Sequence, residues 1–338
     1  MPHGKEIGDV AVTACNSRNS GYLVDVGAEA YFVKTPLSPA QSTTLRHEAS
    51  VYQTLMAADG LHGFAPRLIR YEPDLPILIL QGFSGTDSTD PLLISSRRSL
   101  VRIGRMLGRT LALLHSTPHN KNDVSANSPP PLCLDLPPLG LRTHLSGATT
   151  EFLRLVQHDT ALTGALAQCR RAWRKTSWIH GEIKWPHFLL HRRTDRSAAY
   201  AVRLVDYESS GIGEPAWDLG CVFASYLDSW LASMPPPTCE PVAVMVSRSA
   251  LSPRDVHEAV TALWRAYTRL RGLTVSERDE LLAAALHYVV ASLLWSVFES
   301  SVSLDTLTET ALLRLQVAHN LAQRPREGAR YLLGLPPS

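Results

Sequence analysis

The sequence predicts an α+β protein of two lobes, a small antiparallel lobe at residues 1–82 and a larger, mostly helical lobe at residues 83–338. Short β-branched and aromatic runs separated by polar turns predict the first lobe. Apolar residues that recur at helical spacing from Ser99 onward predict the second. In the middle of the chain, two short apolar strands each lead to an acidic residue, Glu182 and Asp206.

The first lobe is expected to contain three strands, one helix and then two more strands. Polar turns at residues 16–21 and 27–29 separate the first three strands. The helix is expected because Leu45, Ala49 and Tyr52 recur near helical spacing. The expected strands are Val10–Cys15, Tyr22–Val26, Ala30–Lys34, Arg67–Tyr71 and Ile77–Leu80, and the expected helix is Ser42–Ala57.

The second lobe begins with a strongly amphipathic helix, expected at Ser99–His115. The segment Thr117–Pro138 is rich in Asn, Ser and Pro, and this composition predicts an irregular insertion or a flexible loop. The later helices are expected at Glu151–Trp173, Trp217–Met234, Pro253–Arg271, Ser276–Ser301 and Leu307–Gln323.

The composition is that of an ordinary globular protein, with 45% hydrophobic and 19% charged residues. Lys and Arg number 33 against 31 Asp and Glu, and this balance gives no electrostatic case for nucleic acid or a membrane surface as partner. The N-terminus lacks the apolar core of a signal peptide. Polar residues interrupt the apolar stretch Leu281–Phe298, which favours a buried helix over a membrane span. The five cysteines are scattered, so free thiols in a cytoplasmic protein are expected.

The two central strands and their acids form a recurring catalytic arrangement. Glu182 follows the strand at Trp178–Ile179, and Asp206 follows the strand at residues 202–205. Such an arrangement places a general base beside a metal-binding carboxylate, over the phosphates of a nucleotide. A carboxylate suits Mg²⁺ because that ion is small and hard and prefers oxygen ligands.

A lysine and a glutamate in the first lobe match this chemistry. Lys34 lies on the third expected strand, and Glu48 lies on the helix that follows. A strand lysine held by a helix glutamate aims an ammonium group at the α and β phosphates of a nucleotide. Taken alone, the pair also fits a surface lysine and a solvated acid. Its significance comes from the motifs that follow it in order.

These ordered motifs resemble the aminoglycoside phosphotransferase and choline kinase-like family, a branch of the protein-kinase-like fold. The resemblance extends over Val10–Met234. Four family patterns are matched, namely His-Gly-Asp-x-x-x-x-Asn at residues 180–187, Asp-aromatic-Glu at 206–208, Gly-Asp-Pro-Ala-x-Asp-Leu at 213–219 and Leu-Ala-x-Leu-His at 111–115. The resemblance implies a bilobal protein-kinase-like fold, and an enzyme that transfers phosphate from ATP or GTP with Mg²⁺.

The resemblance also implies a role for each matching residue. Lys34 is expected to contact the nucleotide phosphates, and Glu48 is expected to position it. Asp206 is expected to bind Mg²⁺, and Asp218 to accept hydrogen bonds from the catalytic loop. Further nucleotide contacts are expected at Gln81 and Gly82 in the hinge 78–82, and at Ser20 and Gly21 in the phosphate-covering loop 16–21.

Two residues depart from the family pattern where the chemistry occurs. Glu182 stands in place of the catalytic Asp, and its extra methylene moves the base by about one carbon–carbon bond. His187 stands in place of a second metal-binding Asn, and imidazole is a poor ligand for Mg²⁺. Asp206 and His187 are the candidate metal ligands.

Three readings stay open. In the first, Glu182 is a working base and the enzyme is active. In the second, the protein is a catalytically silent pseudokinase that serves as a nucleotide- or partner-binding scaffold. In the third, His187 is only a loop residue, and Asp206 holds Mg²⁺ together with water and phosphate.

The acceptor is expected to be a hydroxyl group. Acidic residues after Asp218 give fair support to a cationic small molecule such as an aminoglycoside. Lys184 resembles a residue of the branch that acts in lanthipeptide- and thioamitide-type natural-product biosynthesis, where a loop lysine neutralises the transferring phosphoryl group. That resemblance implies phosphorylation of Ser or Thr in a precursor peptide, followed by elimination by a partner lyase. Lys184 also fits a solvated charge, and the high Ala, Leu, Arg and Pro content is typical of a GC-rich bacterial source.

Overall fold

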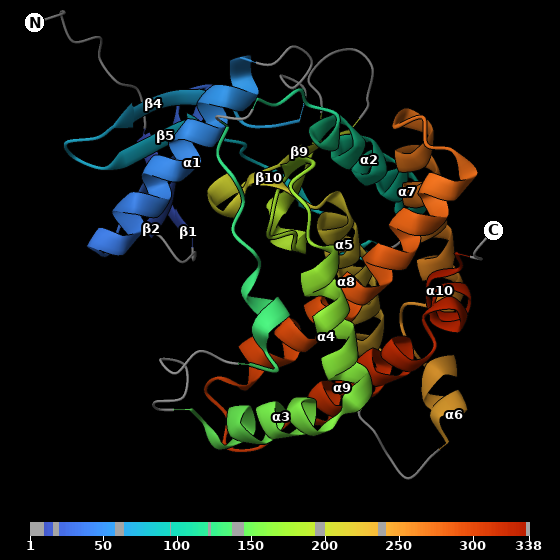
Figure 1. Cartoon of the computed structure of the whole chain (residues 1–338). Coiled ribbons are helices and arrows are strands. Elements are labelled where there is room, and N and C mark those ends of the chain that lie inside the picture. The colour runs from blue at the N-terminus through green and yellow to red at the C-terminus, as the bar shows by residue number, and fades with distance from the viewer. Residues whose placement is uncertain are drawn as a thin grey trace, which may run out of the picture.

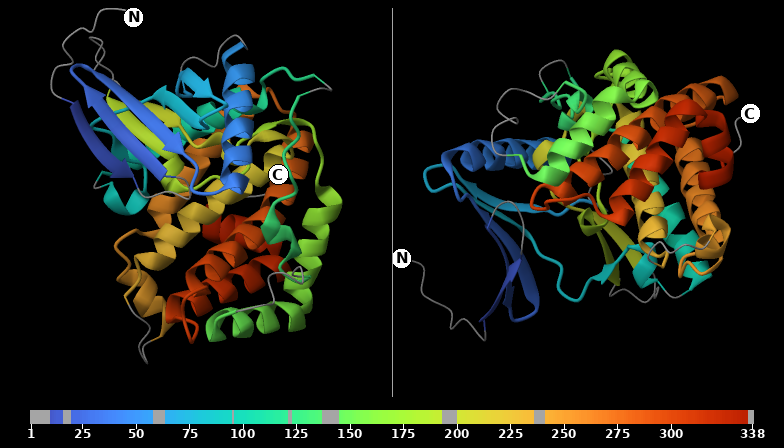
Figure 2. Two further views of the ribbon diagram at one scale, coloured as in Figure 1. Left: turned by 90° about the vertical axis from the view of Figure 1, so that its left-hand side faces the viewer. Right: turned by 90° about the horizontal axis from the view of Figure 1, so that it is seen from below.

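The computed structural model of the chain describes residues 10–15, 20–57, 64–94, 96–120, 123–136, 145–192, 200–235 and 241–335. Five strands form a small N-terminal sheet, and the long helices pack into a larger body beside it (Figure 1). Figure 2 shows the same division from two further sides, with the blue sheet projecting from one end of the helical body. The predicted α+β class, with a five-stranded antiparallel lobe and a mostly helical lobe, is confirmed.

The N-terminal sheet has the strand order β1-β2-β3-β5-β4, and all its neighbouring strands are antiparallel. All of the expected strands are present, as β1 Val10–Cys15, β2 Ser20–Val26, β3 Glu29–Thr35, β4 Leu68–Glu72 and β5 Ile77–Gln81. The expected helix is α1, Pro39–Ala57, which buries Leu45, Tyr52 and Leu55. Glu48 lies on the same face of α1 at helical spacing and is therefore carried into the interior.

Among the described residues, the helical lobe has helices over every expected stretch and two additional short helices. The helices are α2 Arg97–His115, α3 Gly147–His158, α4 Thr160–Ala172, α5 Pro215–Ala232, α6 Val242–Ser247, α7 Pro253–Leu270, α8 Val275–Ser301, α9 Glu309–Gln323 and α10 Pro325–Leu333. The periodicity does not predict α6 and α10, because so few turns leave a weak pattern.

The helical stretch expected over Glu151–Trp173 is divided into two helices, α3 and α4. They separate at Asp159, whose carboxylate accepts the N–H groups of Ala161 at 2.8 Å and Leu162 at 3.1 Å. An N-cap of this kind begins a new helix, since it satisfies backbone donors that have no partner in the first turn.

Close packing of α2 against α7 forms one side of the helical core. Gly104 and Gly108 lie on the contact face of α2. A Cβ added at these positions would come within 2.3 Å of the Ala259 oxygen and 2.2 Å of the Leu263 oxygen on α7. Because glycine has no side chain, the backbones of α2 and α7 can approach each other closely at these two positions.

Helix α8 lies at the centre of the helical lobe. In the part of the chain that the structure describes, it is the one helix long and apolar enough to cross a membrane. Most of that apolar stretch is buried inside the lobe, including Val289, Leu293 and Val297. This burial is that of a core helix, as the interrupted apolar pattern predicts.

Short strands hold the loops of the central region. They are β6 Asp87–Ser88, β7 Ser177–Ile179, β8 Phe188–Arg192, β9 Tyr200–Leu204 and β10 Gly211–Gly213. β7 pairs with β10, while β8 pairs with β6 and β9. The loop 180–187 therefore connects β7 of one small sheet to β8 of the other. Asp206 follows β9, the strand that pairs with β8. The patterns do not predict β6 and β10, which are two and three residues long.

The Asn-, Ser- and Pro-rich insertion is irregular, as predicted, but its described part is held against the helical lobe. It runs along one side of the molecule between α2 and α3 (Figure 1). It contains a 3₁₀ turn at Pro130–Cys133, in which Leu132 is fully buried. The guanidinium of Arg170 donates to both carboxylate oxygens of Asp135, at 2.6 and 2.9 Å. Residues 121, 122, 137 and 138 of the insertion lie outside the described part of the chain.

Candidate active site

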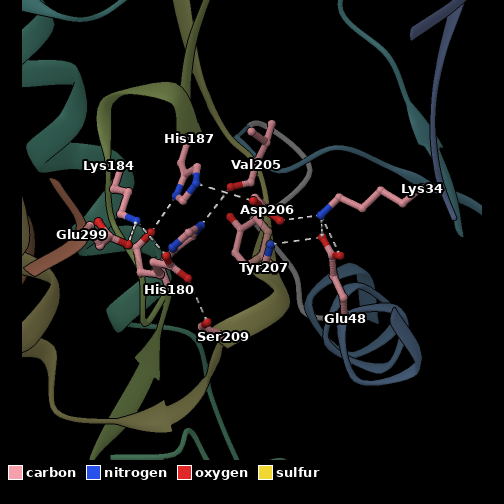
Figure 3. A network of polar contacts seen from close by, with 11 residues as sticks. Lys34, Glu48, His180, Lys184, His187, Val205, Asp206, Tyr207, Ser209 and Glu299 are labelled. Carbon is pink, nitrogen blue, oxygen red and sulfur yellow. Dashed lines mark hydrogen bonds and ion pairs between the residues drawn. The ribbon is translucent and has the colours of Figure 1, made fainter. Parts of the chain in front are cut away.

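A buried lysine on β3 lies between two carboxylates (Figure 3). The Lys34 ammonium contacts the two carboxylate oxygens of Glu48 on α1, at 2.9 and 2.8 Å, and also contacts Asp206 Oδ1. Lys34 is 4% exposed and Glu48 is 0% exposed. The expected strand–helix contact is therefore present, and this burial excludes a solvated surface pair.

The charges of this cluster are set by burial and by one another. Burial lowers the pKa of Lys34, but Glu48 and Asp206 outweigh it and raise that pKa. Burial raises the pKa of Asp206, but Lys34 and His187 outweigh it and lower that pKa. At Glu48 burial dominates and raises the pKa, against the opposing effect of Lys34. At neutral pH the cluster thus presents a lysine cation and an aspartate anion, as phosphate and metal binding require.

The backbone of Asp206 is strained. Its φ of 70° and ψ of 63° make it the one non-glycine residue with positive φ among those described. This conformation costs about 1–3 kcal/mol and persists where surrounding contacts hold it. One such contact is the Tyr207 N–H, which donates to Glu48 Oε1 at 3.2 Å. Glu48 therefore holds both Lys34 and the backbone next to Asp206.

Asp218 on α5 holds the loop 180–187 in place. Its buried carboxylate accepts the N–H of His180 at 2.7 Å and that of Gly181 at 3.0 Å. Gly181 has a φ of +85°, and an added Cβ would come within 2.3 Å of an opposite backbone oxygen, so this turn requires glycine. The His180 ring donates from Nε2 to the Val205 oxygen at 2.9 Å, which connects the loop to the strand before Asp206.

Glu182, the candidate base, is held at both of its carboxylate oxygens. Lys184 Nζ lies 3.0 Å from Oε1, and Ser209 Oγ lies 3.3 Å from Oε2. Lys184 also contacts Glu299 on α8 at 2.9 Å (Figure 3). Burial lowers the pKa of Lys184, but Glu182 and Glu299 outweigh it and raise that pKa. Lys184 is therefore a cation bound between two carboxylates and does not project freely into solvent.

His187 lies between the candidate base and the candidate metal ligand. Its Nδ1 lies 2.6 Å from the Glu182 backbone oxygen, and its Nε2 lies 3.5 Å from Asp206 Oδ2. Burial, with the neighbouring His180, lowers the pKa of His187 to about 4, so the ring is neutral at pH 7. The His187 ring therefore lies next to the Asp206 carboxylate, and its role as a metal ligand stays a prediction.

The donor set of Asp206 and His187 fits a metal ion that is bound together with a nucleotide. Within the described ranges, no group of three or more His, Cys, Asp or Glu side chains gathers to hold a metal by itself. A nucleotide-bound ion needs fewer protein ligands, because phosphate oxygens and water supply the rest. Mg²⁺ at this site stays a prediction.

The expected hinge lies at the end of β5. The Gln81 N–H donates to the Arg67 oxygen and the Gly82 N–H to the Ala30 oxygen, both at 2.8 Å. Gln81 and Gly82 line a cavity of about 400 Å³, together with Arg203 of β9. Since both N–H groups already have partners, contact of these residues with a nucleotide base would use other atoms. That contact stays a prediction.

The expected phosphate-covering loop lies only partly within the described residues. Ser20 and Gly21 begin β2, and Gly21 is directly opposite Lys34 in the register of β2 and β3. The end of the loop is thus brought beside the lysine strand. Residues 16–19 lie outside the described part of the chain, and contact of Ser20 or Gly21 with phosphate stays a prediction.

A cavity of about 770 Å³ lies beside Glu182 and Lys184. Its walls come from α1, from the catalytic-loop candidate, from residues 125–131 of the insertion and from Trp295 and Glu299 of α8. The cavity is large enough for a drug-sized molecule. The acidic side chains that line it are Glu182, Glu208, Asp228 and Glu299.

Three contacts of the site come from residues that the sequence patterns do not identify. Ser209 holds the candidate base, Glu299 holds Lys184, and His47 Nε2 lies 2.8 Å from the Ser210 oxygen. Ser209 directly follows the Asp-aromatic-Glu motif, and this position is a signal that could have identified it. Glu299 is 115 residues from Lys184, and no local pattern connects the two.

Residues 12–235 match the phosphotransferase enzyme family. The matched span is well over half of the chain and includes Lys34, Glu48, Glu182 and Asp206. The chain belongs to this family. The resemblance to phosphotransferases is therefore confirmed, and the polar network lies within the matched residues except for Glu299. No curated protein matches the chain.

Solved aminoglycoside phosphotransferases share the fold of this phosphotransferase family member. A putative aminoglycoside phosphotransferase from Ralstonia eutropha is 13% identical, with a TM-score of 0.55 over 96% of this chain and 93% of that one. ADP-bound APH(2'')-Ib is 12% identical, with a TM-score of 0.54 over 97% and 95%. A thermostable variant of APH(4)-Ia with ADP and hygromycin B is 11% identical, with a TM-score of 0.53 over 94% and 92%. At these identities the similarity establishes a protein-kinase-like fold and not a substrate.

Proposed function

We propose that the chain transfers the γ-phosphate of ATP or GTP to a hydroxyl group of a small-molecule natural product. The observation that carries the proposal is the position of His187, which joins the two halves of the site. One ring nitrogen contacts the Glu182 backbone, and the other faces Asp206, which contacts Lys34. A candidate base, a metal-binding carboxylate and a phosphate-binding cation thus form one connected network. Solved structures of the same fold carry ADP or GDP, which supports either nucleotide.

In the proposed reaction, the acceptor oxygen bonds to the γ-phosphorus while the bond from that phosphorus to the β–γ bridging oxygen breaks. Glu182 orients the acceptor hydroxyl and takes its proton. Lys34 neutralises charge on the phosphates, and Glu48 restricts the motion of its ammonium. A metal ion held at Asp206, when bound, neutralises charge on the phosphate oxygens. The nucleoside diphosphate then leaves.

Two contacts are expected to change as substrates bind. Lys34 contacts Asp206 directly, so a phosphate that reaches Lys34 replaces that contact. Lys184 lies beside Glu182, where its charge stabilises the transferring phosphoryl group. Lys184 must then share its ammonium between the phosphoryl oxygens and Glu299.

The cavity beside Glu182 favours an acceptor that carries positive charge. Lys184 and Arg314 offset part of the charge of the four lining carboxylates, and Arg314 contacts Asp228 at 2.7 Å. Acidic side chains therefore outnumber those of lysine and arginine along the walls of the cavity, and this excess favours amino groups. Solved structures with this fold include complexes with gentamicin and with hygromycin B. An amino-substituted alcohol is therefore the proposed acceptor.

A Ser or Thr side chain of a precursor peptide, processed further by a partner lyase, is a second candidate acceptor. The observation in its favour is the wall that residues 125–131 contribute to the cavity. Ser125, Asn127 and Ser128 are exposed along this wall, so an extended peptide has access to their polar groups. The position of Lys184 beside the candidate base is compatible with a peptide acceptor and with a small-molecule acceptor.

A transfer panel tests both candidates. The purified chain is incubated with ATP or GTP and with aminoglycosides, simpler amino alcohols or Ser/Thr-rich peptides, and products are measured by mass spectrometry. A mass gain of one phosphate on an amino alcohol supports the first candidate, and a gain on a peptide supports the second. Nucleotide binding without transfer to any acceptor supports the silent scaffold. Failure to bind any nucleotide by calorimetry would overturn the proposal.

A further inference from the structure

The His187 ring has the orientation of a metal-binding histidine. Its Nδ1 lies 2.6 Å from the Glu182 backbone oxygen. A carbonyl oxygen only accepts hydrogen bonds, so Nδ1 carries the hydrogen, and Nε2 carries the lone pair of the neutral ring. Histidines that bind metals usually donate their other ring N–H to a backbone carbonyl or a carboxylate, which fixes the tautomer and the orientation of the ring.

The lone pair of His187 faces a carboxylate oxygen. Nε2 lies 3.5 Å from Asp206 Oδ2, and the other carboxylate oxygen, Oδ1, contacts Lys34. Figure 3 shows the His187 ring and the Asp206 carboxylate next to each other. Nε2 and Oδ2 thus face each other across 3.5 Å. A cation placed between them would be attracted to both atoms.

The separation of the two atoms suits a single cation. Adjacent ligands of a small six-coordinate ion stand about 3 Å apart, because the bonds are about 2.1 Å long. The 3.5 Å separation of Nε2 and Oδ2 therefore needs a shift of only about 0.5 Å to match such an ion. The side chains of Asp206 and His187 are 24% and 14% exposed, so each keeps limited access from outside. Phosphate oxygens and water can occupy the other positions of the ion.

We infer that His187 Nε2 and Asp206 Oδ2 hold the nucleotide's metal ion as a nitrogen–oxygen pair, and that this pair selects a first-row transition ion such as Mn²⁺ over Mg²⁺. The inference rests on the proposed function, because the ion accompanies a nucleotide. Mg²⁺ prefers oxygen and dehydrates reluctantly, whereas first-row ions accept imidazole nitrogen, with affinity rising from Mn²⁺ to Co²⁺. The Asn expected here from the family pattern would offer an amide oxygen and no such selection.

The direct test observes the metal and not the reaction. Mn²⁺ bound to the chain with ADP is measured by pulsed electron paramagnetic resonance, which detects the nitrogen nucleus of a coordinated imidazole. We expect a ¹⁴N coupling in the wild-type chain that changes to a ¹⁵N coupling when the histidines are ¹⁵N-labelled. This labelling separates a histidine nitrogen from the nitrogens of adenine and needs no variant.

A matched pair of variants gives the second readout. His187→Asn replaces the proposed ligand with an amide, and His119→Asn alters an exposed histidine as the control. Calorimetry with ADP measures the affinities for Mn²⁺ and Mg²⁺ in each protein. We expect the preference for Mn²⁺ to fall at least about tenfold in His187→Asn and to be unchanged in His119→Asn. Thermal unfolding curves show whether each variant is folded.

The possible outcomes separate this inference from the proposed function. ADP binding with Mn²⁺ but without a histidine nitrogen coupling overturns the nitrogen–oxygen pair and leaves the phosphotransferase proposal standing. An equal metal preference in the wild-type chain and His187→Asn also overturns the selection of Mn²⁺. Failure of ADP to bind with any ion overturns both proposals.

Discussion

The nucleotide side and the acceptor side of the candidate site are built in different ways. Lys34, Glu48 and Asp206 form a buried cluster that connects a strand, a helix and a loop, and all three residue types match the family pattern. On the acceptor side, Lys184 bridges Glu182 to an acid of α8, and its side chain is 36% exposed. In the first cluster Lys34 and Glu48 are buried and only Asp206 is partly exposed, while the second cluster borders a large cavity.

This difference gives a physical reason for the departure from the family pattern at Glu182. Removing one charge from a buried cluster leaves its partner desolvated and unpaired, at a cost of several kcal/mol, so each member of the nucleotide side depends on the others. A partly exposed group can find a new partner in water or on a neighbouring helix. The Glu182 carboxylate contacts two such partners, Lys184 and Ser209. The acceptor side therefore tolerates substitutions better than the nucleotide side does.

Asp206→Ala should break the nucleotide side and have the largest effect. It removes the candidate metal-binding carboxylate and, of the two carboxylates that Lys34 contacts, leaves only Glu48. We expect phosphate transfer to fall about a thousandfold or more, and calorimetry to show weaker metal–nucleotide binding. Asp74→Ala, at an exposed turn between β4 and β5, is the control. Unchanged turnover in Asp206→Ala would refute the metal assignment.

Glu182→Gln should break the acceptor side and leave the nucleotide side intact. The amide keeps the size of the side chain but cannot take a proton, so turnover is expected to fall about 10²- to 10⁴-fold. Nucleotide affinity, measured by calorimetry, should stay at the wild-type value. Glu182→Asp keeps the charge and is expected to lose less activity than Glu182→Gln. Equal losses of turnover and affinity in Glu182→Gln would show that the side chain does not act on the acceptor.

The stability of the protein should be sensitive to acid because His187, which lies between the two sides, becomes protonated. Burial lowers its pKa from 6.5 to about 4. The unfolded chain therefore binds the proton first, and the stability present above pH 6.5 is lost as the pH falls towards 4. We expect this part of the free energy of unfolding to be about 3 kcal/mol and to disappear in His187→Asn. Denaturant titrations at several pH values measure it, and an identical pH dependence in both proteins would contradict the burial.

Glu299→Gln should have the smallest effect, and it measures how much one ion pair contributes to the acceptor side. It removes one of two carboxylates that hold Lys184, in a partly exposed ion pair. Such pairs contribute little, so we expect a change of about twofold to fivefold in the KM for the acceptor, with kcat nearly unchanged. Initial rates at varied acceptor concentration measure both constants, and Glu309→Gln at the exposed start of α9 is the control. A larger loss in kcat than in KM would mean that Glu299 acts on the base.

Local patterns predict the long elements of this fold well and the short ones poorly. The sheet strands β1 to β5 and the helices α1, α2, α5, α7, α8 and α9 all appear near their expected positions, because each carries a clear periodicity or sharp turns. The break at Asp159 is missed, since an N-cap inside a long helical pattern looks like any other polar residue. The described part of the insertion 117–138 is irregular as expected, but its burial depends on partners elsewhere, such as Arg170.

The sequence by itself determined the residue types and their order: a strand lysine, a helix glutamate and two acids that each follow a short strand. Those features are local, because spacing along one strand or helix decides which residues can share a face. Only the tertiary structure decided that the His187 ring faces Asp206 and that α8 supplies an acid to Lys184. These contacts join segments that are distant in the chain, and they depend on how the helices pack around the loop, which no local propensity specifies.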